Sequence, residues 1–413
     1  MRYYKKFDNG LRLIINKIQG LLSVSAGILV KTGSVNEKEN ENGISHFIEH
    51  VMFKGTKTRS AFDISDHIDR IGAQINAFTS KELTCYYTKS TSEHLERSLE
   101  VLSDIFFNSQ FEEKELEKEK GVVIEEINMS KDTPEDICLD LLSQSYYGET
   151  GLGQTILGPI KNIKSFTRES VKNYMDKYYT ADNVVISLAG NVDVELAIQC
   201  VEKMFVKNFK SQRGAEQMKT QINSPKNLYK SKKIEQSHIG FAMNGFTAKD
   251  SLSDAFSIAN TVLGGGMSSR LFQKIREELG LCYSIYSYPS QYKDNGILEI
   301  YAGVNTESRE LATSAIVEEV KKFKKNGITE QEFLRGKEQI KSAFIFGQES
   351  ASSQMLVYGK YLLFLDKQFD FAERIKRIES VSIDDVHEAI SKSFDIESAG
   401  TATVGPKRSA LKI

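Results

Sequence analysis

Short runs in which apolar and polar residues alternate, or in which β-branched and aromatic residues dominate, recur along this chain and predict β-strands. These runs lie at 11–18, 23–33, 73–80, 83–90, 237–246, 283–292 and 297–304. Helical periodicity at 92–107 and 111–130 lies between groups of strands rather than after each strand. That order favours an α+β fold, in which helices cover a mostly antiparallel sheet, over a doubly wound parallel sheet.

The two halves of the chain resemble one another. Residues 165–192 and 380–406 each have the pattern of an amphipathic helix followed by a strand that ends in glycine, at an offset of 215. A second match pairs 111–127 with 328–344 at an offset of 217. Two separate matches at nearly the same offset indicate a tandem duplication of one α+β unit.

Length and composition agree with two soluble globular domains. A single hydrophobic core stops growing at about 250–300 residues, so the 413 residues predict two domains. The polar stretch at 213–233 is the expected linker between a domain at 1–212 and a homologous domain at 234–413. A net charge of −2 argues against a nucleic-acid-binding surface. No window approaches the roughly 18 uninterrupted apolar residues of a membrane span. Four widely spaced cysteines without a CxxC pair indicate reduced thiols in a cytoplasmic protein.

The stretch GISHFIEHVMFKGT at 43–56 places two of the six histidines four residues apart. On a helix, His46, Glu49 and His50 would project from one face. Two imidazoles at this spacing can reach one Zn²⁺, and a carboxylate beside them suits a general base. The competing interpretation is a pair of surface histidines on an amphipathic helix.

A zinc site in a hydrolase needs a third protein ligand. In the helical run at 111–130 the apolar positions predict one buried face, and Glu119 and Glu126 lie on its flank. Glu126 is the carboxylate best placed to reach inward, with Glu119 two turns before it. The alternative is that both are solvated charges in an acidic helix.

The duplication favours the metal site over that alternative. At the offset of 217, Glu126 aligns with Ala343 and Glu119 with Gly336. The counterpart of HFIEH falls in LGGGM at 263–267, which contains no His or Glu. One copy therefore has every candidate ligand and the other has none, whereas scattered surface residues would not be lost as a set.

With these residues the chain resembles the pitrilysin/insulinase-type metallopeptidases, the inverted zincins marked by HxxEH, in their short processing-peptidase-like branch. The resemblance covers essentially the whole chain. It rests on 43–56, on GAQINAFTS at 72–80, on the glutamate 76 residues after His50, and on LGGGMSSRLFQKIREELGLCYS at 263–284.

The resemblance implies a role for each candidate in the first half. His46, His50 and Glu126 would bind one Zn²⁺ per chain, Glu49 would be the general base, and Glu119 would orient a ligand. It also implies that an edge strand binds extended substrate as an added β-strand through Asn76, Ala77 and Phe78.

In the second half, REELGLCY supplies Arg276 and Tyr283, the pair that completes the active site in the family. Tyrosine can donate a hydrogen bond to the charge that develops on a tetrahedral intermediate, and arginine can bind substrate carbonyl or carboxylate groups. The competing interpretation makes Tyr283 an aromatic residue of a strand in the core.

The resemblance implies a zinc endopeptidase that hydrolyses extended or unfolded peptides within an enclosed chamber. The expected assembly is a homodimer whose active sites are completed in trans, and a heterodimer with an inactive paralogue is the alternative. A different class of function is a catalytically weak or inactive peptide-binding or scaffold subunit. A structural zinc protein is disfavoured, because structural sites prefer four ligands rich in Cys.

Overall fold

The computed structural model describes residues 1–209, 214–215, 218, 220, 224–406 and 411. They divide into two compact units. The first unit consists of Met1–Ile127, Thr155–Met218 and Phe346–Phe369, and the second of Asn128–Gln154, Lys219–Ile345 and Asp370–Ile413. Each unit therefore takes one segment from the other half of the chain, and the compact units differ in this respect from the expected domains 1–212 and 234–413.

The expected linker at 213–233 is only partly described. Residues 213, 216–217, 219 and 221–223 lie outside the described part of the chain. Near its end, Asn227–Ser231 form strand β7, so this part of the predicted linker belongs to a sheet.

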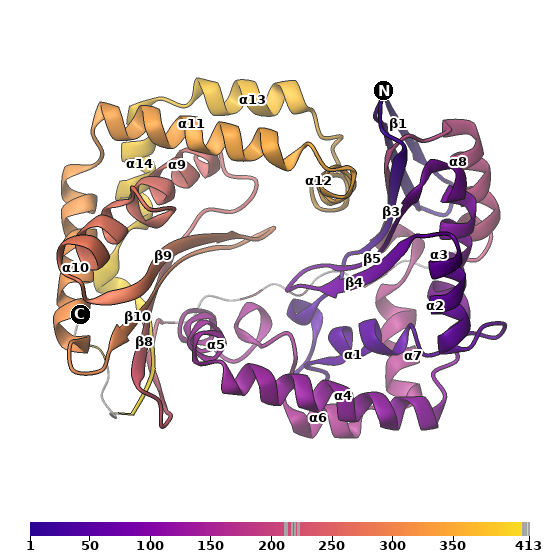
Figure 1. Cartoon of the computed structure of the whole chain (residues 1–413), viewed down its shortest axis with the longest axis horizontal. Helices are drawn as coiled ribbons and strands as arrows, with labels where there is room; N and C mark the ends of the chain where they lie inside the picture. The colour runs from indigo at the N-terminus through magenta and orange to yellow at the C-terminus, as the bar shows by residue number, and fades with distance from the viewer. Residues whose placement is uncertain (210–213, 216–217, 219, 221–223, 407–410, 412–413) are drawn as a thin grey trace. The chain divides into compact units, whose positions relative to one another are not determined.

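The first unit is built on a sheet that, within the described residues, has six strands in the order β1-β2-β6-β3-β5-β4. Figure 1 labels β1, β3, β5 and β4 of this sheet. The strands are β1 (Arg2–Lys6), β2 (Arg12–Lys17), β3 (Ser23–Val30), β4 (Gln74–Thr79), β5 (Thr84–Thr91) and β6 (Val184–Gly190). Neighbouring strands are antiparallel except for β2 and β6. Strand β4 lies at one edge of this sheet.

The second unit repeats this arrangement. Its sheet has the order β7-β11-β8-β10-β9 in the described part of the chain, and its one parallel pair, β7 with β11, corresponds to β2 with β6. The strands are β7 (Asn227–Ser231), β8 (Gln236–Asn244), β9 (Cys282–Gln291), β10 (Gly296–Asn305) and β11 (Gly400–Gly405). The shared strand order confirms the predicted mostly antiparallel α+β fold in two homologous copies.

Helices cover both sheets. The longer ones are α1 (Ile44–Val51), α2 (Ala61–Arg70), α3 (Leu95–Asn108), α4 (Glu113–Asp132), α5 (Pro134–Tyr147), α6 (Ile160–Ser165), α7 (Arg168–Tyr178), α8 (Val194–Val201), α9 (Ser253–Gly264), α10 (Arg309–Asn326), α11 (Glu330–Gly347), α12 (Ala351–Leu365), α13 (Phe371–Ser380) and α14 (Ile383–Ser393). The 3₁₀-helices are η1 (Ser34–Asn36), η2 (Ser92–His94), η3 (Gly151–Gly153), η4 (Ala181–Asn183) and η7 (Ile396–Ser398), and the π-helices are η5 (Glu202–Val206) and η6 (Phe272–Glu278). Among the described helices, none combines the length and apolar character needed to cross a bilayer.

Two equivalent helices pack on the sheet of the other repeat. Helix α12 packs on β2, β3 and β6, and α5 packs on β8 and β11. Glycines allow the close approach. A Cβ on Gly27 in β3 would lie 2.4 Å from Met355 Sδ, and a Cβ on Gly240 in β8 would lie 3.0 Å from Leu142 Cδ2. Each half of the chain therefore completes the core of the unit that the other half begins.

The opposite face of the first sheet holds the main core of that unit. Side chains alternate across β3, so Ala26 and Ile28 face away from α12 and belong to this core. Helix α1 packs there on β4 and β5, and α3 packs on β3 and β5. The edge strand β4 and helix α1 are thus direct neighbours.

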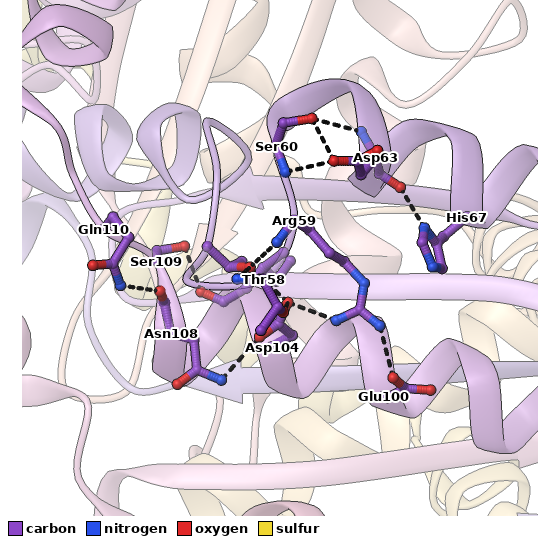
Figure 2. A network of polar contacts seen from close by, with 12 residues as sticks. Thr58, Arg59, Ser60, Asp63, His67, Glu100, Asp104, Asn108, Ser109 and Gln110 are labelled. Atoms are coloured by element: carbon purple, nitrogen blue, oxygen red, sulfur yellow. Dashed lines mark hydrogen bonds and ion pairs between the residues drawn. The ribbon is translucent and has the colours of Figure 1, made fainter.

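A polar network fixes the loop that leaves α1 (Figure 2). Asp104 of α3 accepts a hydrogen bond from Thr56 Oγ1 at 2.8 Å and pairs with Arg59 at 2.7 Å. Arg59 also pairs with Glu100 at 2.6 Å, and the Ser109 hydroxyl donates to the Met52 carbonyl at 2.8 Å. Because the loop is bound to α3 at several points, the C-terminal end of α1 has a defined position.

Candidate metal centre

Helix α1 presents the predicted histidines on one face because its other face is apolar. Phe47 and Ile48 are fully buried in the core of the first unit. His46, Glu49 and His50 project together from the remaining face, as residues three and four apart do on a helix. The His46 and His50 rings are 4.6 Å apart between centroids.

Helix α4 supplies the two predicted carboxylates. Its buried side includes Val123 and Ile127, as its apolar pattern predicts. Glu119 is 4% exposed, whereas the adjacent flank leaves Glu126 half-exposed. Both therefore occupy the flank of the apolar face that the sequence indicates.

The donor atoms of His46, His50 and Glu126 converge. His50 Nε2 and His46 Nε2 lie 3.3 and 3.6 Å from the same carboxylate oxygen, Glu126 Oε2. One donor atom from each of the three residues lies within 4.8 Å of the other two. Within the described residues, this is the group of His, Cys, Asp and Glu side chains that could hold a metal ion.

The hydrogen bond of His50 shows what this group requires. His50 Nδ1 is 2.8 Å from Glu119 Oε1. An ionised carboxylate only accepts, so Nδ1 carries the proton, and a neutral His50 directs the lone pair of Nε2 at Glu126. The lone pairs of His50 Nε2 and Glu126 Oε2 repel each other unless a proton or a metal cation lies between them. Two imidazoles and one carboxylate are a protein donor set of catalytic zinc sites, so the residues fit this ion.

Burial and charge give the two histidines different proton affinities. Burial, together with the charge of His50, lowers the pKa of His46 to about 4 and keeps this imidazole neutral at pH 7. Burial would lower the pKa of His50 as well, but the hydrogen bond and charge of Glu119 outweigh it and raise the pKa. A raised pKa means that any cation held by His50 must compete with a proton, and this competition weakens as pH rises.

Glu119 is itself held by a residue that the sequence did not single out. Lys54, which follows α1, pairs with Glu119 Oε2 at 2.7 Å while His50 binds the other oxygen. Burial would raise the pKa of Glu119, but the hydrogen bonds from His50 and Lys54 outweigh it and lower the pKa. Lys54 lies beyond Val51, the last residue of α1, so helical spacing from His50 gave no signal for this contact.

Glu49 lies outside this ligand group and contacts the edge strand. The Thr79 hydroxyl in β4 donates to Glu49 Oε2 at 2.5 Å. Burial raises the pKa of Glu49, and the hydrogen bond from Thr79 opposes that effect. A raised pKa brings a carboxylate closer to the range in which it can take and return a proton near neutral pH. Thr79 is a second residue that sequence reasoning missed, because a threonine at a strand end carries no distinctive pattern.

The chain matches known proteins over nearly its whole length. Residues 14–160 match the family model described as Insulinase (Peptidase family M16), and residues 165–340 match the Peptidase M16 inactive domain. The uncharacterized zinc protease YmxG of Bacillus subtilis is 42% identical over 399 residues, which cover 97% of each chain. An uncharacterized zinc protease of Rickettsia felis is 35% identical, with 97% of each chain covered.

The chain belongs to the M16 (insulinase) peptidase family. Its fold agrees: a protease from Helicobacter pylori superposes with a TM-score of 0.91 at 22% identity, over 98% of this chain and 99% of that one. The structure of a peptidase M16 inactive domain from Pseudomonas fluorescens also gives a TM-score of 0.91, at 19% identity and full coverage of both chains.

The predicted substrate residues of this M16 chain lie on β4 at the sheet edge. Asn76 and Phe78 point to one face of the sheet and Ala77 to the other, where it packs against the core with α1. Phe78 contacts Tyr87 of β5, with ring centroids 6.4 Å apart. Within the described residues β4 ends the sheet next to Thr79 and Glu49, an edge to which an extended chain can pair. On this strand the Ala77 amide donates to Asn76 Oδ1 at 2.8 Å.

Arg276 and Tyr283 of this M16 chain form a stacked pair in the second unit. The Arg276 guanidinium lies 5.0 Å from the centre of the Tyr283 ring and 4.6 Å from that of Phe272. Tyr283 is the second residue of the edge strand β9, and it is 76% exposed. The competing interpretation, an aromatic residue in the core, is therefore wrong. Tyr283 presents its phenol to solvent, whereas Arg276 is half-buried and also lies 3.7 Å from Glu277 Oε1.

The counterpart of α1 in the second unit carries none of these ligands. Helix α9 is apolar and largely buried, and the segment aligned with HFIEH, 263–267, begins in its last two residues and continues beyond them. This agrees with the match of the second half to an inactive domain.

Proposed function

We propose that this protein is a zinc-dependent endopeptidase that hydrolyses peptide bonds in extended or unfolded peptides. The observation that carries the proposal is the convergence of His46, His50 and Glu126 beside a carboxylate, Glu49, that is not part of the ligand group. A ligand set with a separate, half-buried base fits hydrolysis, whereas a structural site would close the fourth position with another ligand. The relatives named as zinc proteases support the same metal.

The chain's own residues divide the chemistry between them. His46, His50 and Glu126 would hold one Zn²⁺, which polarises water and the scissile carbonyl when it is bound. Glu119 orients His50, and Lys54 holds Glu119. Glu49 takes a proton from the attacking water and delivers it to the leaving amine. The edge of β4 positions the substrate backbone through Asn76, Ala77 and Phe78, and Tyr283 and Arg276 stabilise the developing charge.

The alternative function is an inactive peptide-binding or scaffold subunit. The match of residues 165–340 to an inactive domain is compatible with it. An inactive subunit has no need of a base poised beside three converged ligands, and here Glu49, His46, His50 and Glu126 are all present. We therefore favour the peptidase. Three buried free thiols, Cys85, Cys138 and Cys200, suit a reducing compartment such as the cytoplasm.

Cleavage should require zinc and an unfolded substrate. We expect the purified protein to cleave an internally quenched, unstructured peptide, to lose that activity with a chelator, and to regain it with stoichiometric Zn²⁺. A tightly folded protein that contains the same cleavage sequence should resist, because only an extended segment can pair with β4. A zinc-loaded protein that binds the peptide without cleaving it would instead support the scaffold function.

We further propose a homodimer in which Arg276 and Tyr283 of one subunit serve the zinc site of the other. The support is the duplication, which places the ligands in one repeat and the Arg–Tyr pair in the other. A heterodimer with an inactive paralogue is the alternative assembly.

Subunit mixing tests the trans arrangement. Equal amounts of Glu49→Gln and Tyr283→Phe should be inactive alone and recover about a quarter of wild-type activity after exchange, because half of the dimers are mixed and each mixed dimer then has one intact site. Sites completed within one chain would give no recovery, since every site would carry a lesion. Verified exchange without recovery contradicts the trans proposal.

A further inference from the structure

The N-terminus of α1 is capped by a residue seven positions upstream. The residue at the cap position, Gly43, has a φ of 98° and no side chain to accept a hydrogen bond. The Glu37 carboxylate takes this role: Oε2 accepts from the Gly43 amide and Oε1 from the Ser45 amide, each at 2.8 Å. Two of the amide donors that a helix start leaves unpaired are thereby satisfied.

Glu37 is a buried carboxyl group surrounded by hydrogen-bond donors. Its side chain is 1% exposed, and Asn42 Nδ2 donates to Oε2 at 2.9 Å in addition to the two amides. Burial raises the pKa of Glu37, and the hydrogen bonds from Gly43, Asn42 and Ser45 oppose that effect. A buried carboxylate without such partners is costly, whereas an anion at a helix N-terminus is favoured.

The surrounding loops leave this cap little freedom. Asn42 Nδ2 also donates to the Thr155 carbonyl at 2.8 Å, and Asn162 Nδ2 donates to the Asn42 carbonyl at 3.0 Å. A Cβ on Gly158 would lie 2.3 Å from the Asn42 carbonyl oxygen and 2.6 Å from Gly43 Cα. The segment before α6 therefore packs directly against the backbone on which Glu37 acts.

We propose that Glu37 is a positioning residue for the metal centre, fixing the first turn of α1 so that His46, Glu49 and His50 face Glu126 and Glu119. The proposal rests on the proposed zinc site and goes beyond it by assigning a role to a residue that touches neither ligand nor base. Helix α1 is only eight residues long, and His46 lies in the turn that Glu37 caps. A shift of this turn moves His46 directly, and a displacement of about 1 Å is enough to spoil a metal or catalytic geometry.

The test is the zinc affinity of Glu37→Gln, measured by competition with a chromogenic chelator. The amide can accept from one backbone N–H, but its own NH₂ faces the other donor, so we expect affinity to fall by about 10- to 100-fold, as for partners that orient ligands. Glu39→Gln is the matched control, because Glu39 is an 86% exposed carboxylate on the same loop, and its affinity should stay within twofold of wild type. Circular dichroism at the assay temperature must show both variants folded.

A second variant covers the case in which Glu37→Gln does not fold. Asn42→Ser removes one of the hydrogen bonds to Glu37 and should lower zinc affinity by a smaller factor, with a lower kcat at saturating zinc and an unchanged KM. If Glu37→Gln folds, a zinc affinity within twofold of wild type would overturn the proposal. If it does not fold, the same result for Asn42→Ser would overturn it. Because zinc affinity is measured without turnover, a wild-type protein that binds zinc but cleaves nothing would contradict the peptidase function and leave this test decisive.

Discussion

Replacement of Glu49 by glutamine is expected to lower kcat by about 10²- to 10⁴-fold, the usual contribution of a general base, while one zinc per chain stays bound. The amide is nearly isosteric and its oxygen can still accept from Thr79, so the fold and the contact to β4 should survive. What is lost is the ability to take a proton from water. Steady-state cleavage of a quenched peptide, with zinc measured by atomic emission, gives both quantities.

Glu125→Gln is the matched control for this experiment. Glu125 is an exposed carboxylate on α4 next to Glu126, and it is absent from the ligand group. Its replacement should leave both kcat and zinc content near wild type. Near-normal turnover of Glu49→Gln would show that another group takes the proton.

Loss of a ligand should have a larger effect on the metal than loss of the residue that orients it. We expect His50→Ala and Glu126→Gln to weaken zinc binding by more than about 100-fold, because changes in partners that only orient ligands already cost about 10- to 100-fold. Glu119→Gln should fall within that lower range, since it leaves all three donors in place and alters only the hydrogen bond to His50 Nδ1. Chelator competition ranks the variants, and equal affinities for His50→Ala and Glu119→Gln would contradict the division between ligand and orienting residue.

The strands and helices that carry strong patterns were predictable from sequence. Strands such as β3 and β10 have buried, β-branched runs, and α4 has a clear apolar stripe. Strands β1 and β7 were not predicted. Both lie at sheet edges, are short and carry lysines on exposed positions, so their pairing depends on the neighbouring strand rather than on their own hydrophobic pattern.

Nothing in the sequence indicates that α5 and α12 each pack on the sheet of the other repeat. An apolar face shows that a helix is buried, and it does not show which of two similar sheets covers it. For the candidate site, sequence spacing identified His46, Glu49, His50 and Glu126 as candidate residues. The fold places these four side chains close together. Lys54, Thr79 and Glu37 act through other side chains or the backbone, and such contacts appear only when distant segments meet.

The most direct measurement determines zinc content and peptide cleavage on the same preparations of wild type, Glu49→Gln and Glu126→Gln. A peptidase with the proposed ligand set and base predicts three different results. Wild type should hold one zinc and cleave, Glu49→Gln should hold zinc without cleaving, and Glu126→Gln should have lost both properties. A Glu126→Gln protein that keeps a full complement of zinc, or a Glu49→Gln protein that cleaves at the wild-type rate, would contradict the account.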